Sequence, residues 1–494
     1  MRFPPGMNWI GALAIAAAVI IAGAWSVSPQ FKDRVTAVTT AGGTQAATGS
    51  RTDTGGPAAT GPGGGGGSQG SSTTVTTGGG PSGGATPPPG GFQCAAGLNG
   101  GATDVGVTGT QIRLASTLAE SGVGASFLGD AHYAMDAVIA EQNSKGGICG
   151  RQLVLSVADD GWNASTGLTD IRNFIAEKYF ALAVMPSSQG LNAASVAPFG
   201  SGDIDAAGIP VIGSDGMLFS QYADPLMWPV AASTISTAHV AAKNGYDAGS
   251  RTFGIVYDAD YKFGSEGAHA FAAALSRLPG AQLKASVPIK AGQQSYPTDV
   301  QTFETQCQPC DFTFMLLEPD TAVAWIKSDN STQHYIFGSK RTAGPQPLFV
   351  KQFGVACADL CNNMWVWTGY KAPYPPYDTD PADAEYVQTI RRVSQRTDIS
   401  NQFLEGAYVG AKLLISALTA VGPNLTRARL RAQLDGMTFD SGLTQPLTWR
   451  PGHHFANPAM LGYTIQFSNG FNGFQYQQTG WVPDAWLGQD GPNA

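Results

Sequence analysis

The chain has 494 residues, a formal charge of −8 at pH 7, 43% hydrophobic residues and 13% charged residues. A chain of this length can bury more than one core, so we predict two lobes. An acidic chain without any run of Lys and Arg disfavours nucleic acid and anionic lipid surfaces as main partners, because such surfaces favour clustered positive charge.

An almost unbroken apolar run, Trp9 to Val27, follows a short amino-terminal stretch with one arginine. The run is about long enough to cross a bilayer, so residues 1–30 are predicted to be a membrane anchor or a cleaved signal segment. Residues 31–93 are rich in Gly, Ser, Thr and Pro and are predicted to be a flexible spacer. The rest of the chain is therefore expected outside the cytoplasm, anchored to the cell membrane or secreted.

Six cysteines lie beyond the apolar run, and an even number is typical of disulfides in an oxidising compartment. They are Cys94, Cys149, Cys307, Cys310, Cys357 and Cys361. We expect Cys94 to pair with Cys149, and the other four to pair within the second lobe, either locally or across their two segments. Zinc binding by those four and redox chemistry at Cys307 and Cys310 are the alternatives. The second cysteine spacing is loose for zinc, and the first pair precedes a strand, where a redox motif would follow one.

From Gln111 onward, short apolar runs alternate with helical patterns. This alternation predicts an α/β fold of parallel strands connected by crossover helices. Strands are predicted at 112–116, 153–158, 181–186, 210–214, 252–258, 312–317 and 364–370. Helices are predicted at 129–144, 165–179, 266–277 and 403–421. A parallel sheet places its ligand crevice beyond the carboxyl ends of its strands, so residues that follow a strand are candidates for ligand contact.

Three segments occur in the order and spacing of a known family: IRLASTLAESG from position 112, NSKGGICGRQLVL from 143 and ADDGWNAS from 158. They resemble the branched-chain amino-acid-binding (Leu/Ile/Val-binding) family of type I periplasmic binding proteins, the substrate-binding proteins of ABC transporters. Further agreement is found in MPSSQG from 185, GIPVI from 208, DADYKFG from 258, GLTQPLTW from 442 and PGHH from 451. The resemblance covers about residues 104–486.

The resemblance implies a two-lobed type I periplasmic-binding fold, in which each lobe is a doubly wound, mostly parallel sheet. Three hinge crossovers are expected near residues 231, 368 and 440. The first lobe would comprise 104–231 and 369–438, the second 232–367 and 442–486, with a tail at 487–494. A small-molecule solute would lie between the lobes, and hinge closure would present it to membrane permease and ATPase subunits. We expect a monomer without cofactor, metal ion or catalytic activity.

In the first lobe, the resemblance selects two ligand-binding loops. Ser187, Ser188 and Gln189 correspond to a loop whose hydroxyls and amides hold a ligand's carboxylate, and a helix cap is the alternative. Ser214 and Asp215 correspond to the loop that binds the ligand's polar head. Asp215 departs from the family pattern, and it either accepts a hydrogen bond from an ammonium group or caps the next turn.

In the second lobe, Glu318 corresponds to a carboxylate that binds an ammonium group in some relatives. Asp320 is a competitor, and helix capping is again the alternative. Phe263 precedes a glycine where the family commonly has tyrosine, so Tyr261 is the candidate for the hydroxyl contact. Further residues expected to line the crevice are Glu120, Phe127 and Trp162.

We therefore predict an extracytoplasmic solute-binding protein that captures a small polar solute, amino-acid-like or amide-like, and delivers it to an ABC-type permease. The alternative is a ligand sensor or a surface interaction module of the same fold. Neither H-E-x-x-H nor a phosphate-binding G-x-x-x-x-G-K motif occurs in the sequence. The adjacent histidines 453 and 454 would point to opposite faces of a strand, which disfavours a shared metal ion.

Overall fold

A computed structural model describes the folded part of the chain. The described residues are 94, 99–184, 186–307, 310–329, 340–343, 364–373, 379–451, 454–456, 459–467 and 474–492. The predicted anchor or signal segment, the predicted spacer, Cys357 and Cys361 lie outside them. All described residues belong to one compact unit, Ser82–Ala494.

The first lobe is built on a parallel sheet with the strand order β2-β1-β3-β4-β5. Its strands are β1 (Gln111–Leu118), β2 (Gln152–Asp159), β3 (Ala181–Ala183), β4 (Val211–Ile212) and β5 (Met227–Trp228). The helices α3 (Ala131–Ser144) and α4 (Ala164–Ala176) connect the first three strands. The central strands β3 and β4 are apolar and fully buried, as expected for strands covered on both faces.

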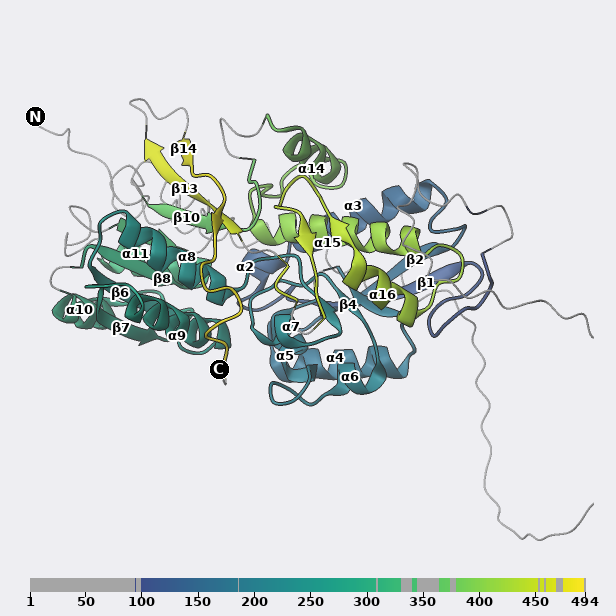
Figure 1. The fold of residues 1–494 in the computed structure, drawn as a ribbon, viewed down its shortest axis with the longest axis horizontal. Helices are drawn as coiled ribbons and strands as arrows, with labels where there is room; N and C mark the ends of the chain where they lie inside the picture. The colour runs from purple at the N-terminus through teal and green to yellow at the C-terminus, as the bar shows by residue number, and fades with distance from the viewer. Residues whose placement is uncertain are drawn as a thin grey trace, which may run out of the picture. The chain divides into compact units, whose positions relative to one another are not determined.

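Three helices from late in the sequence pack on this first lobe, namely α14 (Pro381–Arg391), α15 (Gln402–Val421) and α16 (Arg427–Gly436). Helix α15 lies beside α3 and contacts β3 and β4 (Figure 1). At this contact, a Cβ on Gly410 would come within 2.5 Å of the carbonyl oxygen of Val184, so any side chain there would push α15 off the sheet. Among the described residues, α15 alone is long and apolar enough to span a membrane, and this packing accounts for its composition.

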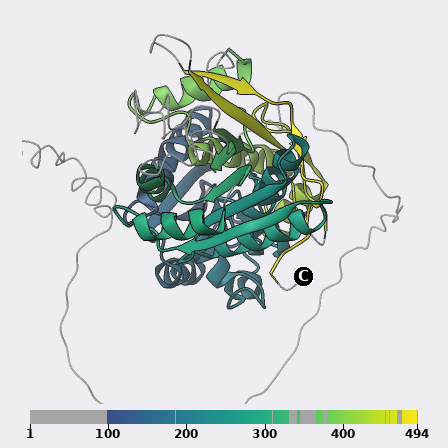
Figure 2. The same cartoon turned by 90° about the vertical axis from the view of Figure 1, so that its left-hand side faces the viewer.

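The second lobe is built on a mixed sheet with the order β14-β13-β10-β9-β8-β6-β7, and β15 pairs with β13. The parallel strands are β6 (Thr252–Asp258), β7 (Gln282–Ile289), β8 (Phe312–Leu316), β9 (Lys340–Ala343) and β10 (Trp365–Thr368). The antiparallel strands are β13 (Ala459–Phe467), β14 (Phe474–Gln478) and β15 (Val482–Pro483). Figure 2 shows the yellow strands β13 and β14 extending this sheet. The two sheets confirm the predicted α/β fold.

Helices α8 (Thr234–Asp247), α9 (Lys262–Ser276), α10 (Pro297–Gln306) and α11 (Pro319–Asp329) belong to the second lobe. Shorter elements are α2 (Ala125–Leu128), α5 (Ser188–Ala194), α6 (Asp203–Ala207), α7 (Ser220–Ala223) and the hairpin β11 (Thr438–Phe439) with β12 (Leu447–Thr448). After this hairpin, the indole Nε1 of Trp449 donates to the Pro229 carbonyl oxygen, and the ring of His454 stacks on Trp228. The hairpin region therefore packs beside β5 before the chain enters the second sheet at β13.

Two disulfides lie in the described residues. Cys94 is bonded to Cys149, the expected pair, and Cys307 is bonded to Cys310, the local alternative for the second lobe. The buried Arg151 lies two residues after Cys149 of the first disulfide. Its guanidinium donates to carbonyl oxygens of Thr108, Gly101 and Pro423 at 2.8, 2.9 and 3.1 Å, and so ties the start of the lobe to the loop that follows α15.

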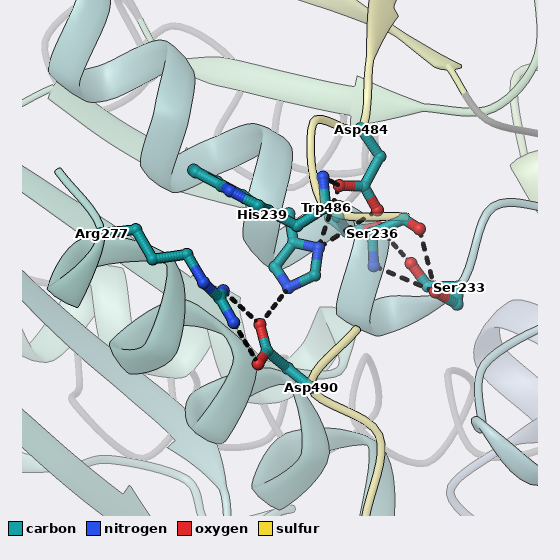
Figure 3. A network of polar contacts seen from close by, with 8 residues as sticks. Ser233, Ser236, His239, Arg277, Asp484, Trp486 and Asp490 are labelled. Atoms are coloured by element: carbon teal, nitrogen blue, oxygen red, sulfur yellow. Dashed lines mark hydrogen bonds and ion pairs between the residues drawn. The ribbon is translucent and has the colours of Figure 1, made fainter. Parts of the chain in front are cut away.

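The carboxy-terminal segment is fixed to the second lobe by a buried imidazole (Figure 3). His239 of α8 is fully buried, with Nδ1 2.9 Å from Asp484 Oδ1 and Nε2 2.9 Å from Asp490 Oδ2. The imidazole thus joins two acidic side chains of the carboxy-terminal segment. Arg277 of α9 adds two hydrogen bonds to Asp490 at 2.5 and 2.6 Å, and these hold the pKa of that carboxyl below its usual range.

We expect Asp490→Asn to lower the free energy of unfolding by about 2 kcal/mol, because it removes the negative charge beside Arg277 and replaces one acceptor oxygen with an NH2 donor. The measurement is urea unfolding of the variant and the parent chain. The control is Asp247→Asn, which removes an exposed ion pair with Lys243 on the same helix and should change stability by less than about 0.5 kcal/mol. Equal losses in both variants would show that the carboxy-terminal segment does not depend on Asp490.

Candidate functional site

A cavity lies between the two lobes, at the ends of strands from both sheets. Its volume is about 90 Å³, below the range of roughly 300–1,000 Å³ for drug-sized ligands, so it suits a small solute. The first lobe and the late helices contribute Phe127, Trp162, Asp215, Met217, Ala231, Gly369, Tyr370, Gln402 and Phe403. The second lobe contributes Ala232, Thr234, Thr237, Phe263, Leu316, Leu317, Glu318, Pro319 and Met460.

The lobes touch each other around this cavity. The ring centroids of Trp162 and Tyr261, one from each lobe, are 5.7 Å apart. The backbone N–H of Phe219 in the first lobe donates to Glu266 Oε2 of α9 at 2.9 Å. Glu266 is buried, and this burial raises the pKa of its carboxyl. The lobes therefore contact each other beside a cavity that stays partly open to solvent.

Aromatic rings form a large part of the cavity wall. The ring centroid of Phe127 lies 4.2 Å from that of Trp162 and 5.2 Å from that of Phe403, and Trp162 lies 6.4 Å from Phe263. We call these four residues the aromatic cluster. They come from α2, the loop after β2, α15 and α9, so helices and a loop from both lobes must meet to form it.

Local backbone geometry places two members of this cluster. Trp162 has a φ of 58°, in the left-handed region, and its N–H donates to the buried Asp160 Oδ1 at 2.9 Å, which fixes the turn after β2. Phe263 lies in the first turn of α9, beside Gly264. A Cβ on Gly264 would come within 1.9 Å of the carbonyl oxygen of Asp258, so only glycine lets this turn approach the end of β6.

Asp215, after β4, contributes a buried carboxylate to the cavity wall. It accepts hydrogen bonds from the Ser188 N–H at 2.7 Å, from Gln221 Nε2 at 3.0 Å and from the Met217 N–H at 3.3 Å. Burial raises the pKa of Asp215 to about 6, although these donors oppose the shift. The hydrogen bond from the Met217 N–H caps the turn after β4. Turn capping was one of the two roles that the sequence analysis gave for Asp215.

Glu318, after β8, contributes the second carboxylate. Its oxygens accept from the N–H groups of Asp320 at 3.0 Å and Thr321 at 2.7 Å, so it caps the start of α11. The Glu318 N–H in turn donates to Asp258 Oδ2 at 2.6 Å. Burial, reinforced by the neighbouring carboxylates of Glu318 and Asp260, raises the pKa of Asp258 to about 8. Different backbone amides thus bind the two acidic side chains at the end of the second sheet.

Two polar atoms of the cavity wall have no hydrogen-bond partner among the described residues. They are the hydroxyl oxygen of Tyr370 and the indole Nε1 of Trp162, in side chains of residues only 2% and 6% exposed. Behind Tyr370 lies Glu405 of α15, fully buried, whose carboxyl pKa is raised well above its usual range by burial and by the acidic neighbours Asp383 and Asp398. Buried polar atoms of this kind are rarely left without partners, so a bound solute is the natural partner.

Of the residues selected from the sequence, the structure brings five to the cavity wall: Phe127, Trp162, Asp215, Phe263 and Glu318. Tyr261 stacks on Phe263 at 6.0 Å between centroids, beside the cavity but not in its wall. The carboxylate of Glu120 is 3.7 Å from the His132 ring and does not line the cavity.

Four other selected residues lie behind the wall. Ser187, Ser188 and Ser214 are buried, and Gln189 is half-buried on α5, yet none of the four lines the cavity. The Ser188 amide is occupied by Asp215. Ligand contact by these four residues, as by the five in the wall, stays a prediction.

Sequence reasoning missed several wall residues. Tyr370 follows β10 directly, so the strand-end rule that selected Glu318 could have selected it as well. Gln402 and Phe403 lie at the start of α15, and Thr234 and Thr237 lie in the first turn of α8. Nothing in their local sequence distinguishes them from ordinary helix residues, because their role depends on where the helices pack.

Among the described residues, no group of three or more His, Cys, Asp or Glu side chains is arranged to hold a metal ion. Cys357 and Cys361, two of the four cysteines considered for zinc, lie outside the described residues. His453, the neighbour of His454, also lies outside them. The other two, Cys307 and Cys310, are joined to each other.

Comparison with known proteins gives one family. Residues 111–470 match a family model described as "Periplasmic binding protein". Among curated proteins, none matches the chain significantly. Similar solved structures include a fatty acid ABC transporter substrate-binding protein from Thermomonospora curvata, at 17% identity and a TM-score of 0.63, covering 81% of this chain and 96% of that one.

Two further structures are a possible leucine/isoleucine/valine-binding protein from Rhodopirellula baltica SH 1 and a branched-chain amino acid transporter substrate binding protein from Streptococcus pneumoniae. The first has 17% identity and a TM-score of 0.60, covering 74% of this chain and 96% of that one. The second, solved with isoleucine, has 14% identity and a TM-score of 0.59, covering 75% and 100%. At these identities the likeness shows the shared fold.

The raised pKa of Asp258 predicts a pH dependence of stability. Between about pH 4 and about pH 8, the folded chain keeps a proton on Asp258 that the unfolded chain has lost, so the free energy of unfolding falls as the pH rises. The Asp258→Asn variant has no carboxyl group at this position, so its stability does not depend on this proton. Relative to the variant, the parent chain should lose up to about 1.4 kcal/mol per pH unit across that window. Urea unfolding at pH 5, 6 and 7 measures the difference, and parallel curves would contradict the assignment.

Proposed function

Because the chain belongs to the periplasmic binding protein family, we propose that it captures a small polar solute, amino-acid-like or amide-like, between its lobes and delivers it to an ABC-type permease. The observation that carries the proposal is the cavity lined by residues of both lobes, with two buried polar atoms that lack partners among the described residues. A solute held there would contact both lobes at once. It would therefore stabilise the closed conformation over an open one.

Opening would separate contacts that join the two lobes. Trp162 would leave Tyr261, and the Phe219 amide would leave Glu266. Opening would also expose the aromatic cluster to water, which costs free energy in proportion to the apolar area uncovered. A solute that fills the cavity adds contacts to the closed state alone, so the permease could distinguish a loaded protein from an empty one by its conformation.

Periplasmic binding proteins function outside the cytoplasm, and the two disulfides agree with an oxidising compartment. We propose that the apolar run at Trp9–Val27 anchors the chain to the membrane, and that the Gly-rich stretch at 31–93 gives the lobes reach to a permease in the same membrane. We propose no reaction at the site, because binding and release of the solute account for its geometry.

The proposal is tested by thermal denaturation of the full-length chain, purified in a mild detergent, with amino acids, amides, short-chain acids and sugars. We expect one class to raise the melting temperature, because a ligand that binds only the folded state stabilises it by mass action. If none of the four classes raises it, capture of an amino-acid-like or amide-like solute from these classes is contradicted. Loss of uptake of the same solute in cells lacking the chain would then test delivery.

Trp162→Ala should lower the affinity for that solute by about 10-fold or more, since it removes a ring from the cavity wall and a donor that lacks a protein partner. Isothermal titration calorimetry measures the change. The matched control is Trp481→Ala, a half-buried tryptophan of the second lobe that does not line the cavity. Equal affinities in the two variants would place the binding site elsewhere.

A further inference from the structure

We propose that the captured solute is an organic ammonium ion that carries a hydroxyl or amide oxygen and no carboxylate group. The inference rests on the proposed function, because it concerns the charge of the solute that the same cavity accepts. Among the amino-acid-like and amide-like solutes, it selects those that carry a positive charge and no negative charge.

The charges of the cavity wall favour a cation. Asp215 and Glu318 are acidic, and none of the described wall residues is Lys, Arg or His. A zwitterionic amino acid would place its carboxylate in a cavity whose wall has no basic side chain to balance it. Burying an unpaired charge in this way is strongly unfavourable. An ammonium ion instead finds two acidic side chains and no opposing charge.

The Ser188 amide, which the family resemblance assigns to a ligand carboxylate, lies behind the cavity wall and is already occupied. The Ser188 N–H, which follows β3, donates to the side chain of Asp215 at 2.7 Å. The protein's own carboxylate therefore takes the place that an anionic ligand group would need. A second anion beside Asp215 would be repelled by it at short range.

Glu318 retains capacity to accept a further hydrogen bond. A carboxylate offers about four acceptor positions. Glu318 accepts from the Asp320 amide and from the amide and hydroxyl of Thr321. It therefore has a position left for an N–H or O–H group of the solute. Asp215, whose donors are Ser188, Gln221 and Met217, lines the same cavity.

The aromatic cluster and two buried polar atoms give independent support. Aromatic rings attract ammonium ions through their negative faces, and clusters of rings are a known means of binding alkylated ammonium groups. The Tyr370 hydroxyl and the indole N–H of Trp162 lack partners among the described residues and belong to nine-tenths buried wall residues. Both can donate to an oxygen atom, so the ammonium ion should also carry a hydroxyl or an amide oxygen.

The test is a charge series at constant shape, measured by isothermal titration calorimetry on the full-length chain. Choline is compared with 3,3-dimethylbutan-1-ol, glycine betaine and 3,3-dimethylbutanoate, which share its head of three methyl groups. Ethanolamine is compared with propan-1-ol, glycine and propanoate as a smaller series. In at least one series, the ammonium compound should bind at least about 10-fold more tightly than its uncharged alcohol. The zwitterion and the anion should bind more weakly than the alcohol.

Variants assign the effect to the cavity wall. Asp215→Asn should remove most of the preference for the ammonium compound over the alcohol. The control is Asp224→Asn, because Asp224 is also fully buried and accepts two backbone N–H groups, yet it does not line the cavity. The control should keep the preference. The series on the unmodified chain does not depend on how well either variant folds.

Two outcomes overturn the inference and leave solute capture intact. One is tighter binding of a zwitterion or an anion than of its ammonium partner. The other is binding of an amino acid, acid or sugar from the broader solute panel while both ammonium compounds fail to bind. If no compound of the panel or of either series binds, the proposed function and this inference are both wrong.

Discussion

The structure depends on hydrogen bonds from backbone amides to buried carboxylates at the ends of strands. The Ser188 amide binds Asp215, the Glu318 amide binds Asp258, and two amides at the start of α11 bind Glu318. In an apolar interior an unpaired carboxylate is costly, and each of these amides offsets part of that cost. Because the donors are backbone groups, no lysine or arginine has to enter the cavity. The result is an acidic, aromatic cavity without a resident counter-ion.

This arrangement couples the fold to the function. Parallel sheets direct the carboxyl ends of their strands to one edge, and here the edges of two sheets contribute to one cavity. Neither lobe encloses the cavity alone, since the aromatic cluster needs α9 from one lobe and α2, α15 and the β2 loop from the other. Under the proposed function, closure and binding would be one event, in which the solute contacts residues of both lobes.

The carboxy-terminal segment joins two helices of the second lobe. His239 is buried on α8, the helix that follows the first passage between the lobes, and Asp484 and Asp490 hold it on both sides. Arg277 on α9 joins the same network. The helices α8 and α9 are thereby fixed to each other and to the end of the chain. Thr234, Thr237 and Phe263, which line the cavity, lie on these two helices and keep their positions relative to one another.

The sequence by itself determined the α/β class, the family resemblance, several central strands and five residues of the cavity wall. The run TFGIVYD at 252–258 is strand β6 without any shift, and Glu318 lines the cavity because it follows a strand. Apolar runs and strand ends are local features, so a sequence pattern reveals them. Strand β7, which has alternating exposed and buried residues, was not predicted, nor were β13 and β14, which the chain adds to the second sheet from far along the sequence. Only the tertiary structure decided that Phe403 and Tyr370 line one cavity with Trp162 and Asp215. It also decided that Asp215 accepts the hydrogen bond of the Ser188 amide. These contacts join segments that lie far apart in the sequence, and their spacing carries no signal of their proximity.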